Sequence, residues 1–263
     1  MPIFRWCPRP GPHGNMNTHF QFKQFRIEQS QCAMKVSTDA CLFGAWVSRF
    51  LKEREWPSQP APRVLDIGAG TGLLSLMIRQ EWVCEVTAVE LDPAAAQQCA
   101  GNFKESPWAF GMNAIEADIC GFTSDIQFDC IVSNPPFFAD DLPAPGKERN
   151  QARHEQGLRL TSLLEAAQSL ISESGWIFLM YPARRLGDVL ETAAAFGLNP
   201  AEIVSVAHSE MHPVSRHFYA LQRRKINTRQ VALCLRDASG VYSPEFKRLL
   251  EPYYLDRLLN STA

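Results

Sequence analysis

The residues best suited to chemistry in this sequence follow a short apolar segment, Phe128–Ser133, and read Asn134–Pro135–Pro136–Phe137. Proline has no N–H and a fixed φ, so the two prolines end the predicted strand and stiffen the chain after it. The residue before a proline is extended, which turns the Asn134 side-chain oxygen and the Pro135 carbonyl outward as two rigid acceptors. Beside the Phe137 ring, these acceptors suit an amino group on a flat ring, which donates both hydrogens while the ring stacks. An ordinary polyproline turn is the alternative interpretation of the four residues taken alone.

A second group of candidate residues surrounds a glycine-rich turn. The segment 63–67 is predicted as a buried strand, and Gly68, Gly70 and Gly72 follow it, before a predicted helix. A strand, a glycine turn and a helix form the opening unit of a doubly wound α/β sheet. A dinucleotide-binding turn has the spacing G-x-G-x-x-G, whereas here Asp66 begins the pattern D-x-G-x-G-x-G. A carboxylate at this place suits the ammonium of a methionine moiety and would repel a pyrophosphate.

Two further carboxylates follow the next predicted strands. Glu90 ends the strand predicted over 85–89, where it can accept both hydroxyls of a ribose, and Asp118 ends the strand predicted over 113–118. The series from Asp66 through the glycines to Glu90 and Asp118 resembles the class I S-adenosylmethionine-dependent methyltransferases. The resemblance implies a Rossmann-like α/β fold, a seven-stranded and mostly parallel sheet with helices on both faces, and S-adenosyl-L-methionine as the cofactor.

The N-terminal part of the chain contains a third candidate group. Apolar and polar residues alternate over 20–25, which predicts an edge strand or a hairpin. Lys35 then precedes Thr38 and Asp39, either of which is a natural N-cap for the apolar helix predicted over 40–52. Two interpretations are open. In the first, these residues serve only as a cap; in the second, Lys35 and the helix N-terminus face an anion such as a carboxylate.

The remaining chain continues the alternation of helices and strands. Helices are predicted over 73–80, 93–104, 158–172, 184–196 and 244–250, and strands over 128–133, 175–180, 202–207, 217–222 and 231–235. We expect a flexible extension over 1–19 and one methyltransferase domain over 20–263, divided into an N-terminal cap (20–52), a nucleotide-binding core (63–208) and a C-terminal hairpin and tail (209–263). The polar segment 139–156 is predicted to be a functional lid.

Composition limits the class of protein and its partners. The 263 residues are 46% apolar, enough for a full core, and contain no apolar run long enough to span a membrane. The eight cysteines have no metal-ligand spacing, which predicts free thiols in a reducing cytoplasm and no metal. A net charge of −2 gives no overall attraction to nucleic acid, so RNA would need local basic groups. The candidates for an RNA-facing surface are Lys23, Arg26, Lys35, Arg153, His154, Arg223, Arg224 and Lys225.

The Asn134 motif resembles the [N/D/S]-P-P-[Y/F/W] sequence of amino-methyltransferases, which methylate exocyclic base amines or the glutamine side chain. The rest of the chain from Phe20 onward is similar to the bacterial tRNA adenine-N6 methyltransferase family, which modifies the adenosine 3′ of the anticodon in a valine tRNA. The matching segments are 22–25, 32–36, 38–39, 44–46, 152–155 and 242–246.

This resemblance assigns roles to individual residues. It implies that Asn134, Pro135, Pro136 and Phe137 hold the adenine. It implies a cofactor site of Lys35, Thr38, Asp39, Asp66, Gly68, Gly70, Gly72, Glu90, Leu91, Asp118, Ile119 and Asn134. The expected partner is the anticodon loop of a tRNA, bound by a monomer without metal. The alternatives are a protein glutamine-N5 methyltransferase, an rRNA guanine-N2 methyltransferase, and a non-catalytic RNA-binding protein on the same fold. The intact Asp66, Glu90 and Asn134 argue against the last.

Overall fold

An eight-stranded sheet forms the centre of the computed structural model, which describes residues 18–56, 60–135 and 158–259. The strand order is β10-β8-β9-β7-β6-β3-β4-β5, and β9 alone runs antiparallel to the others. The strands are β3 (Arg63–Ile67), β4 (Glu85–Glu90), β5 (Met112–Glu116), β6 (Phe128–Ser133), β7 (Ile171–Pro182), β8 (Asn199–Ala207), β9 (Val214–Gln222) and β10 (Arg229–Cys234). The class I methyltransferase architecture is confirmed, with one strand more than the seven that were predicted.

The additional strand also corrects the predicted C-terminal hairpin. The last two strands do not pair with each other, because β10 lies beside β8 and runs parallel to it. The antiparallel partner of β9 on that side is β8, and the two are joined by residues 208–213. The alternation of apolar residues identified each strand, but it carries no information on which neighbour a strand chooses.

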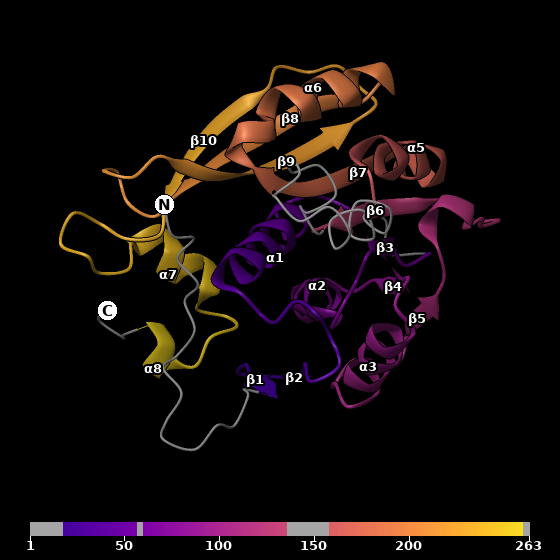
Figure 1. Ribbon diagram of the computed structural model, residues 1–263, viewed down its shortest axis with the longest axis horizontal. Helices are drawn as coiled ribbons and strands as arrows, with labels where there is room; N and C mark the ends of the chain where they lie inside the picture. The colour runs from indigo at the N-terminus through magenta and orange to yellow at the C-terminus, as the bar shows by residue number, and fades with distance from the viewer. Residues whose placement is uncertain (1–17, 57–59, 136–157, 260–263) are drawn as a thin grey trace, which may run out of the picture.

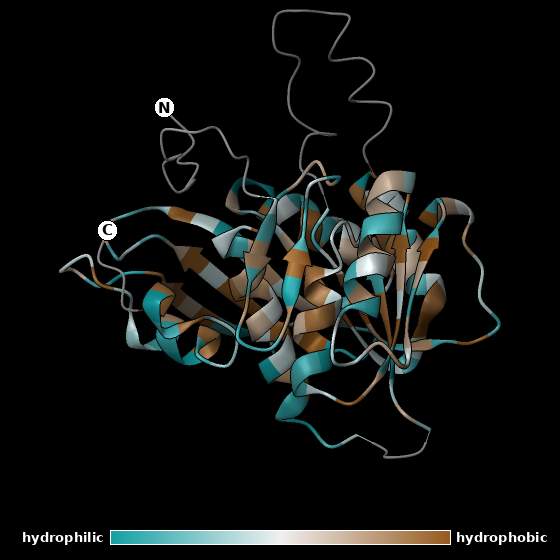
Figure 2. Ribbon diagram, turned by 90° about the horizontal axis from the view of Figure 1, so that it is seen from below, coloured by the Kyte–Doolittle hydropathy of each residue, from teal (hydrophilic) through white to brown (hydrophobic). Residues whose placement is uncertain are grey.

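Helices cover both faces of the sheet (Figure 1). One face carries α1 (Thr38–Lys52), α2 (Leu73–Glu81), α3 (Pro93–Lys104), α7 (Pro244–Leu250) and α8 (Asp256–Leu259). The other carries η1 (Ile119–Gly121), α5 (Leu160–Leu170), η3 (Ala183–Arg185) and α6 (Leu186–Ala195). Figure 2 shows the consequence, with hydrophobic residues concentrated in the strands and the inner helix faces. The central strand β6 is buried from Cys130 to Ser133, as a parallel strand covered on both faces must be. None of the helices in the described ranges is long and apolar enough to cross a membrane.

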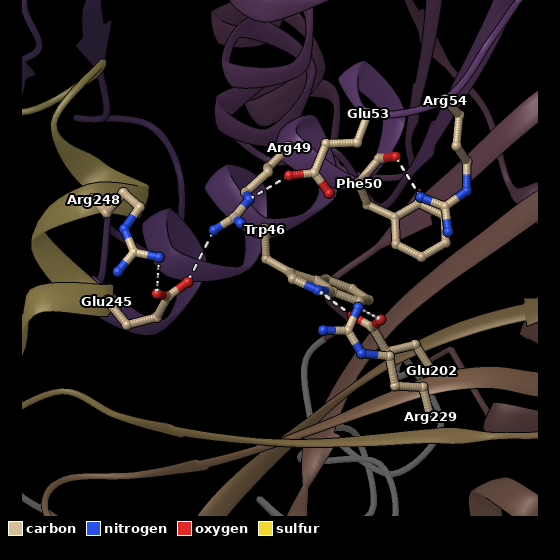
Figure 3. A network of polar contacts seen from close by, with 9 residues as sticks. All are labelled: Trp46, Arg49, Phe50, Glu53, Arg54, Glu202, Arg229, Glu245 and Arg248. Carbon is tan, nitrogen blue, oxygen red and sulfur yellow. Dashed lines mark hydrogen bonds and ion pairs between the residues drawn. The ribbon is translucent and has the colours of Figure 1, made fainter.

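The helix α1 is buried along most of its length, because the sheet, α2 and α7 surround it. Polar contacts fix its middle and its C-terminal half, which Figure 3 shows from close by. The Trp46 indole N–H donates to Glu202 of β8 at 2.9 Å, and Arg229 of β10 pairs with the same carboxylate at 3.3 Å. Arg49 pairs with Glu245 of α7 at 2.9 Å. These contacts hold α1 against β8 and α7.

A two-stranded hairpin precedes α1 and confirms the prediction for this segment. The strands β1 (His19–Gln21) and β2 (Arg26–Glu28) pair antiparallel, and the stacked rings of Phe22 and Phe25 lie between them in sequence, with centroids 4.5 Å apart. The N-cap of α1 is a correction. It is Ser37, whose hydroxyl accepts from the Ala40 N–H at 3.2 Å, and not Thr38 or Asp39.

The parallel arrangement gives the sheet two different edges. At one edge β3, β4, β5, β6 and β7 end and the antiparallel β9 begins; we call it the carboxyl edge. At the opposite edge, the amino edge, the parallel strands begin and β9 ends. Ligands of doubly wound sheets bind at the carboxyl edge. Asp66, Glu90 and Asn134 all lie there, at the ends of β3, β4 and β6.

Candidate active site

The glycine turn between β3 and α2 has a backbone that only glycine adopts easily. Gly68, Gly70 and Gly72 have φ of 68°, 55° and 77°, in the left-handed region. A Cβ added at Gly68 or Gly70 would meet nothing within 4 Å, whereas at Gly72 it would lie 2.6 Å from Phe103 Cε1 and 2.8 Å from Cys99 Sγ of α3. The first two glycines therefore border open space that a ligand can enter, and the third lets the turn pack against α3.

Glu90 holds this turn from the end of β4. Its Oε2 accepts from the Gly70 N–H at 2.8 Å, and its Oε1 accepts from the Asp92 N–H at 3.0 Å. Asp92 in turn caps α3, because its Oδ1 accepts from the Ala95 N–H at 2.8 Å. Leu91, between them, is 56% exposed. A fixed carboxylate beside an exposed apolar side chain suits a nucleoside, with the ribose on the acid and the base on Leu91.

Asp66 is buried at the end of β3 and only half of its carboxyl group has partners. Its Oδ2 accepts from the Ser75 hydroxyl at 2.7 Å and the Ser75 N–H at 3.2 Å, which joins it to the first turns of α2. Its Oδ1 is buried with no hydrogen-bond partner among the residues described. Burial raises the pKa of Asp66 to about 7, although the bonds from Ser75 oppose this. The unpartnered oxygen is available to a cationic ligand group.

Asn134 lies beside the glycine turn, because Ile67 of β3 and Ser133 of β6 are register partners. The buried Ser133 hydroxyl donates to the Ile67 carbonyl at 2.8 Å and fixes the two strand ends together. The Asn134 Oδ1 is buried and has no hydrogen-bond partner within the described part of the chain. A buried acceptor without a partner is costly, so it points to a ligand donor. Pro135 is buried next to it, while Pro136 and Phe137 lie outside the described residues.

Asp118 and Ile119 follow β5 at the same edge. The Asp118 Oδ1 accepts from the Cys120 N–H at 2.9 Å and begins the short helix η1, in which Ile119 is buried. The sheet thus brings Asp66, the glycines, Glu90, Leu91, Asp118, Ile119 and Asn134 to one edge. Whether each of them contacts a cofactor stays a prediction.

Lys35 differs from the expectation that it faces an anion, whereas the cofactor roles of Thr38 and Asp39 stay predictions. The Lys35 ammonium donates to the Gln29 carbonyl and, at 3.0 Å, to the Cys32 carbonyl, so it closes its own loop. Thr38 is the first residue of α1. Burial raises the pKa of Asp39, against the opposing charge of Arg216, whose Nε lies 3.6 Å from its Oδ2.

Those of the predicted RNA-facing residues that the structure describes are not brought together. On the hairpin, Lys23 pairs with Asp256 at 3.0 Å and Arg26 pairs with Glu28. The run 223–225 follows the end of β9, and Arg223 donates to the carbonyl of Ile171, the first residue of β7, at 3.4 Å. This places the run at the amino edge, about 20 Å or more from Asn134, since a strand rises about 3.3 Å per residue. Arg153 and His154 lie outside the described residues.

Sequence reasoning missed two buried polar residues that support the site, Ser75 and Asn102. Asn102 left a detectable signal, because it stands between Cys99 and Phe103 on an otherwise apolar stripe of α3. A polar residue in such a stripe needs a buried partner. Ser75 left none, because a serine in the first turns of a helix is common.

Comparisons with known proteins agree with this geometry. The family model "Methyltransferase small domain" matches residues 47–179. A "tRNA1(Val) (adenine(37)-N6)-methyltransferase" from Yersinia pestis (strain Pestoides F) is 38% identical over 241 residues, which are 90% of this chain and 94% of that protein. A protein of the same name from Yersinia pseudotuberculosis serotype O:3 (strain YPIII) is also 38% identical, and 92% of its length is covered.

A solved structure of a predicted O-methyltransferase from Agrobacterium tumefaciens superposes with a TM-score of 0.60 at 15% identity, over 81% of this chain and 95% of that chain. At this level of identity, the likeness concerns the fold alone. The assignment of the chain to a family rests instead on the relatives that it matches over nearly their full length. The chain belongs to the tRNA1(Val) (adenine(37)-N6)-methyltransferase family.

Proposed function

We propose that this protein transfers a methyl group from S-adenosyl-L-methionine to N6 of an exposed adenine in tRNA, the adenosine at position 37 beside the anticodon. The observation that carries the proposal is the buried Asn134 Oδ1, which has no hydrogen-bond partner among the described residues and lies next to a glycine turn that leaves open space for a ligand. The name of the relatives supplies the position in the tRNA.

The residues at the carboxyl edge fit the cofactor. Glu90 takes the ribose hydroxyls, Gly68 and Gly70 let the cofactor approach the backbone, and the free Asp66 oxygen takes the ammonium. Bound there, the cofactor supplies a methyl group already activated by a sulfonium, so alignment of donor and acceptor provides much of the acceleration. No metal and no covalent nucleophile is needed.

The chain's own contribution is to hold the amine. The N6 lone pair of adenine is delocalised into the ring, which makes the nitrogen a poor nucleophile. Two N–H bonds, to the Asn134 Oδ1 and the Pro135 carbonyl, favour a more pyramidal nitrogen and stabilise the positive charge that develops on it. Losing one such partner costs about 10²–10³ in rate. Phe137 stacks on the base, which is worth about 1–3 kcal/mol.

The RNA approaches from the carboxyl edge, where Asn134 lies. Arg216 lies near the start of β9 at this edge, and Arg184 follows the end of β7 in η3. An anticodon loop presents its bases unstacked at low cost and brings phosphates within reach of these side chains. The run 223–225 lies at the amino edge and is not part of this proposed contact.

A protein glutamine methyltransferase using the same tetrapeptide is the rival function. The test is to incubate the purified protein with S-adenosylmethionine and valine tRNA transcript, digest the RNA, and identify the methylated nucleoside by mass spectrometry. We expect N6-methyladenosine. A folded, cofactor-binding protein that leaves tRNA unmodified but methylates glutamine in proteins would overturn the proposal.

A further inference from the structure

The helix α3 makes hydrogen bonds to two other segments, the glycine turn and the end of the N-terminal hairpin. Asn102 on this helix is 3% exposed and uses its whole amide. Its Nδ2 donates to the Thr71 carbonyl at 2.8 Å and to the Glu28 carbonyl at 2.9 Å, and its Oδ1 accepts from the Glu28 N–H at 2.9 Å. Thr71 belongs to the glycine turn and Glu28 ends the N-terminal hairpin, so a single side chain joins them.

On the side of the glycine turn, the Asn102 bond is one of three restraints. Gly72 packs on Phe103 and Cys99 of the same helix, and the Gly70 N–H is held by Glu90, which lies two residues before the N-cap of α3. Each residue from Gly70 to Gly72 thus has a contact of its own, either with α3 or with the residues that lead into α3. These contacts tie the position of the turn to that of the helix.

On the other side, α3 holds the segment that leads from the hairpin to α1. Gln98, one turn before Asn102, accepts from the Gln31 N–H at 2.9 Å. Within this segment, Lys35 closes the loop onto the carbonyls of Gln29 and Cys32, and the Gln29 Oε1 accepts from the Val36 N–H at 2.8 Å. The loop is therefore an internally bonded unit attached to α3.

This loop begins beside the glycine turn. Because one nitrogen, the Asn102 Nδ2, donates to both the Glu28 and the Thr71 carbonyls, the end of the hairpin and the turn lie next to each other on α3. Asn102 is therefore a buried side chain that bonds to both the hairpin and the turn, and a change at either segment is felt by the other through it.

We propose that Asn102 is a positioning residue for the cofactor, which couples the segment 28–36 to the glycine turn so that the two close on the ligand as one unit. The inference needs only the cofactor and not the tRNA, so it fails separately from the proposed function. Because the coupling acts on both segments, cofactor bound at the turn must also restrain the segment 28–36.

The first measurement uses the wild-type chain. Hydrogen exchange followed by mass spectrometry, with and without saturating S-adenosylmethionine, should show slower exchange of the amides of residues 28–36 in the bound protein. The Asn102→Asp variant keeps the shape and the acceptor but loses both donated bonds. It should bind the cofactor about tenfold more weakly in calorimetry and lose most of the protection over 28–36.

Lys23→Ala is the matched control, because it loosens the hairpin from the C-terminal tail without touching the glycine turn. It should lower the melting temperature with little change in cofactor affinity, which separates positioning from general stability. A folded Asn102→Asp protein with wild-type affinity would overturn the proposal. The proposal would also be overturned if the amides of residues 28–36 in the wild type exchanged at the same rate with and without the cofactor. This second outcome does not depend on whether the variant folds.

Discussion

The Glu90 carboxylate accepts a hydrogen bond from the Gly70 amide at 2.8 Å, so the residue expected to bind the ribose also shapes the glycine turn. Its other oxygen accepts from the Asp92 N–H just before α3, so the carboxylate joins the turn to the start of this helix. Removing this side chain should therefore be more damaging than removing a group that only binds the ligand.

We expect Glu90→Ala to weaken S-adenosylmethionine binding by about 100-fold, because a hydrogen bond to a charged group is worth about 1.5–3 kcal/mol and the variant lacks more than one. Calorimetry measures the affinity, and hydrogen exchange at Gly70 reports the turn. Glu116→Ala is the control, because Glu116 is an exposed carboxylate on β5 in register with Glu90. Equal affinities for the two variants would remove Glu90 from the cofactor site.

The buried Asp66 carboxyl group predicts that the stability of the protein depends on pH. Its pKa is raised from 3.8 to about 7 in the folded chain, so the folded state binds more protons than the unfolded state across this interval. Stability from this group is therefore greatest at acid pH and is lost as the pH rises through about 7. Unfolding by urea should show this loss in the wild type and not in Asp66→Asn.

The same carboxyl group predicts proton release on cofactor binding. An ammonium beside Asp66 lowers its pKa, so binding near or below neutral pH must expel a proton. Calorimetric enthalpies at about pH 6.5, measured in two buffers of different ionisation enthalpy, should differ for the wild type and agree for Asp66→Asn. Identical wild-type enthalpies would show that the ammonium does not reach this group.

Gly72 and Gly101 form a natural pair for testing the packing of the turn. Gly72→Ala should destabilise the protein by about 2–5 kcal/mol, because the Cβ meets Phe103 and the residue has a left-handed φ. Gly101→Ala, in the interior of α3 with open space around its Cβ, should stabilise it by about 0.5–1 kcal/mol. Urea unfolding gives both values, and a tolerated alanine at position 72 would contradict the close packing of the turn on the helix.

The element order was predictable because each buried strand is a short apolar run followed by a turn or a polar residue, as at Ile67–Gly68 and Ser133–Asn134. The same logic placed Asp66, Glu90 and Asn134 at strand ends, and the structure brings them to one edge because the parallel strands end together. The pairing of β10 with β8 was not predictable, because the apolar pattern of a strand does not say which of the other strands it pairs with. The role of Lys35 was also hidden, because its acceptors are backbone carbonyls of its own loop.

The two ends of β9 allow the RNA-facing edge to be tested. Arg216→Ala and Arg184→Ala, at the carboxyl edge, should weaken tRNA binding and reduce the log–log salt slope by about one unit for each phosphate that the protein no longer neutralises. Arg224→Ala and Lys225→Ala, on exposed positions at the amino edge, serve as controls of equal charge change. Filter binding over a salt series measures the slope. A larger effect from the amino-edge pair would mean that the RNA lies on the other side of the sheet.

In the proposed reaction Asn134 holds an adenine amine for methyl transfer, and single-turnover kinetics measure this role. Labelled methyl transfer is followed into an anticodon stem-loop with adenosine at position 37, with a guanosine-substituted stem-loop as the control. We predict N6-methyladenosine at that position only, and a rate about 10²–10³ lower for Asn134→Ala with nearly unchanged RNA affinity. Transfer to the guanosine control, or a near-normal rate for Asn134→Ala, would show that Asn134 does not hold an adenine amine.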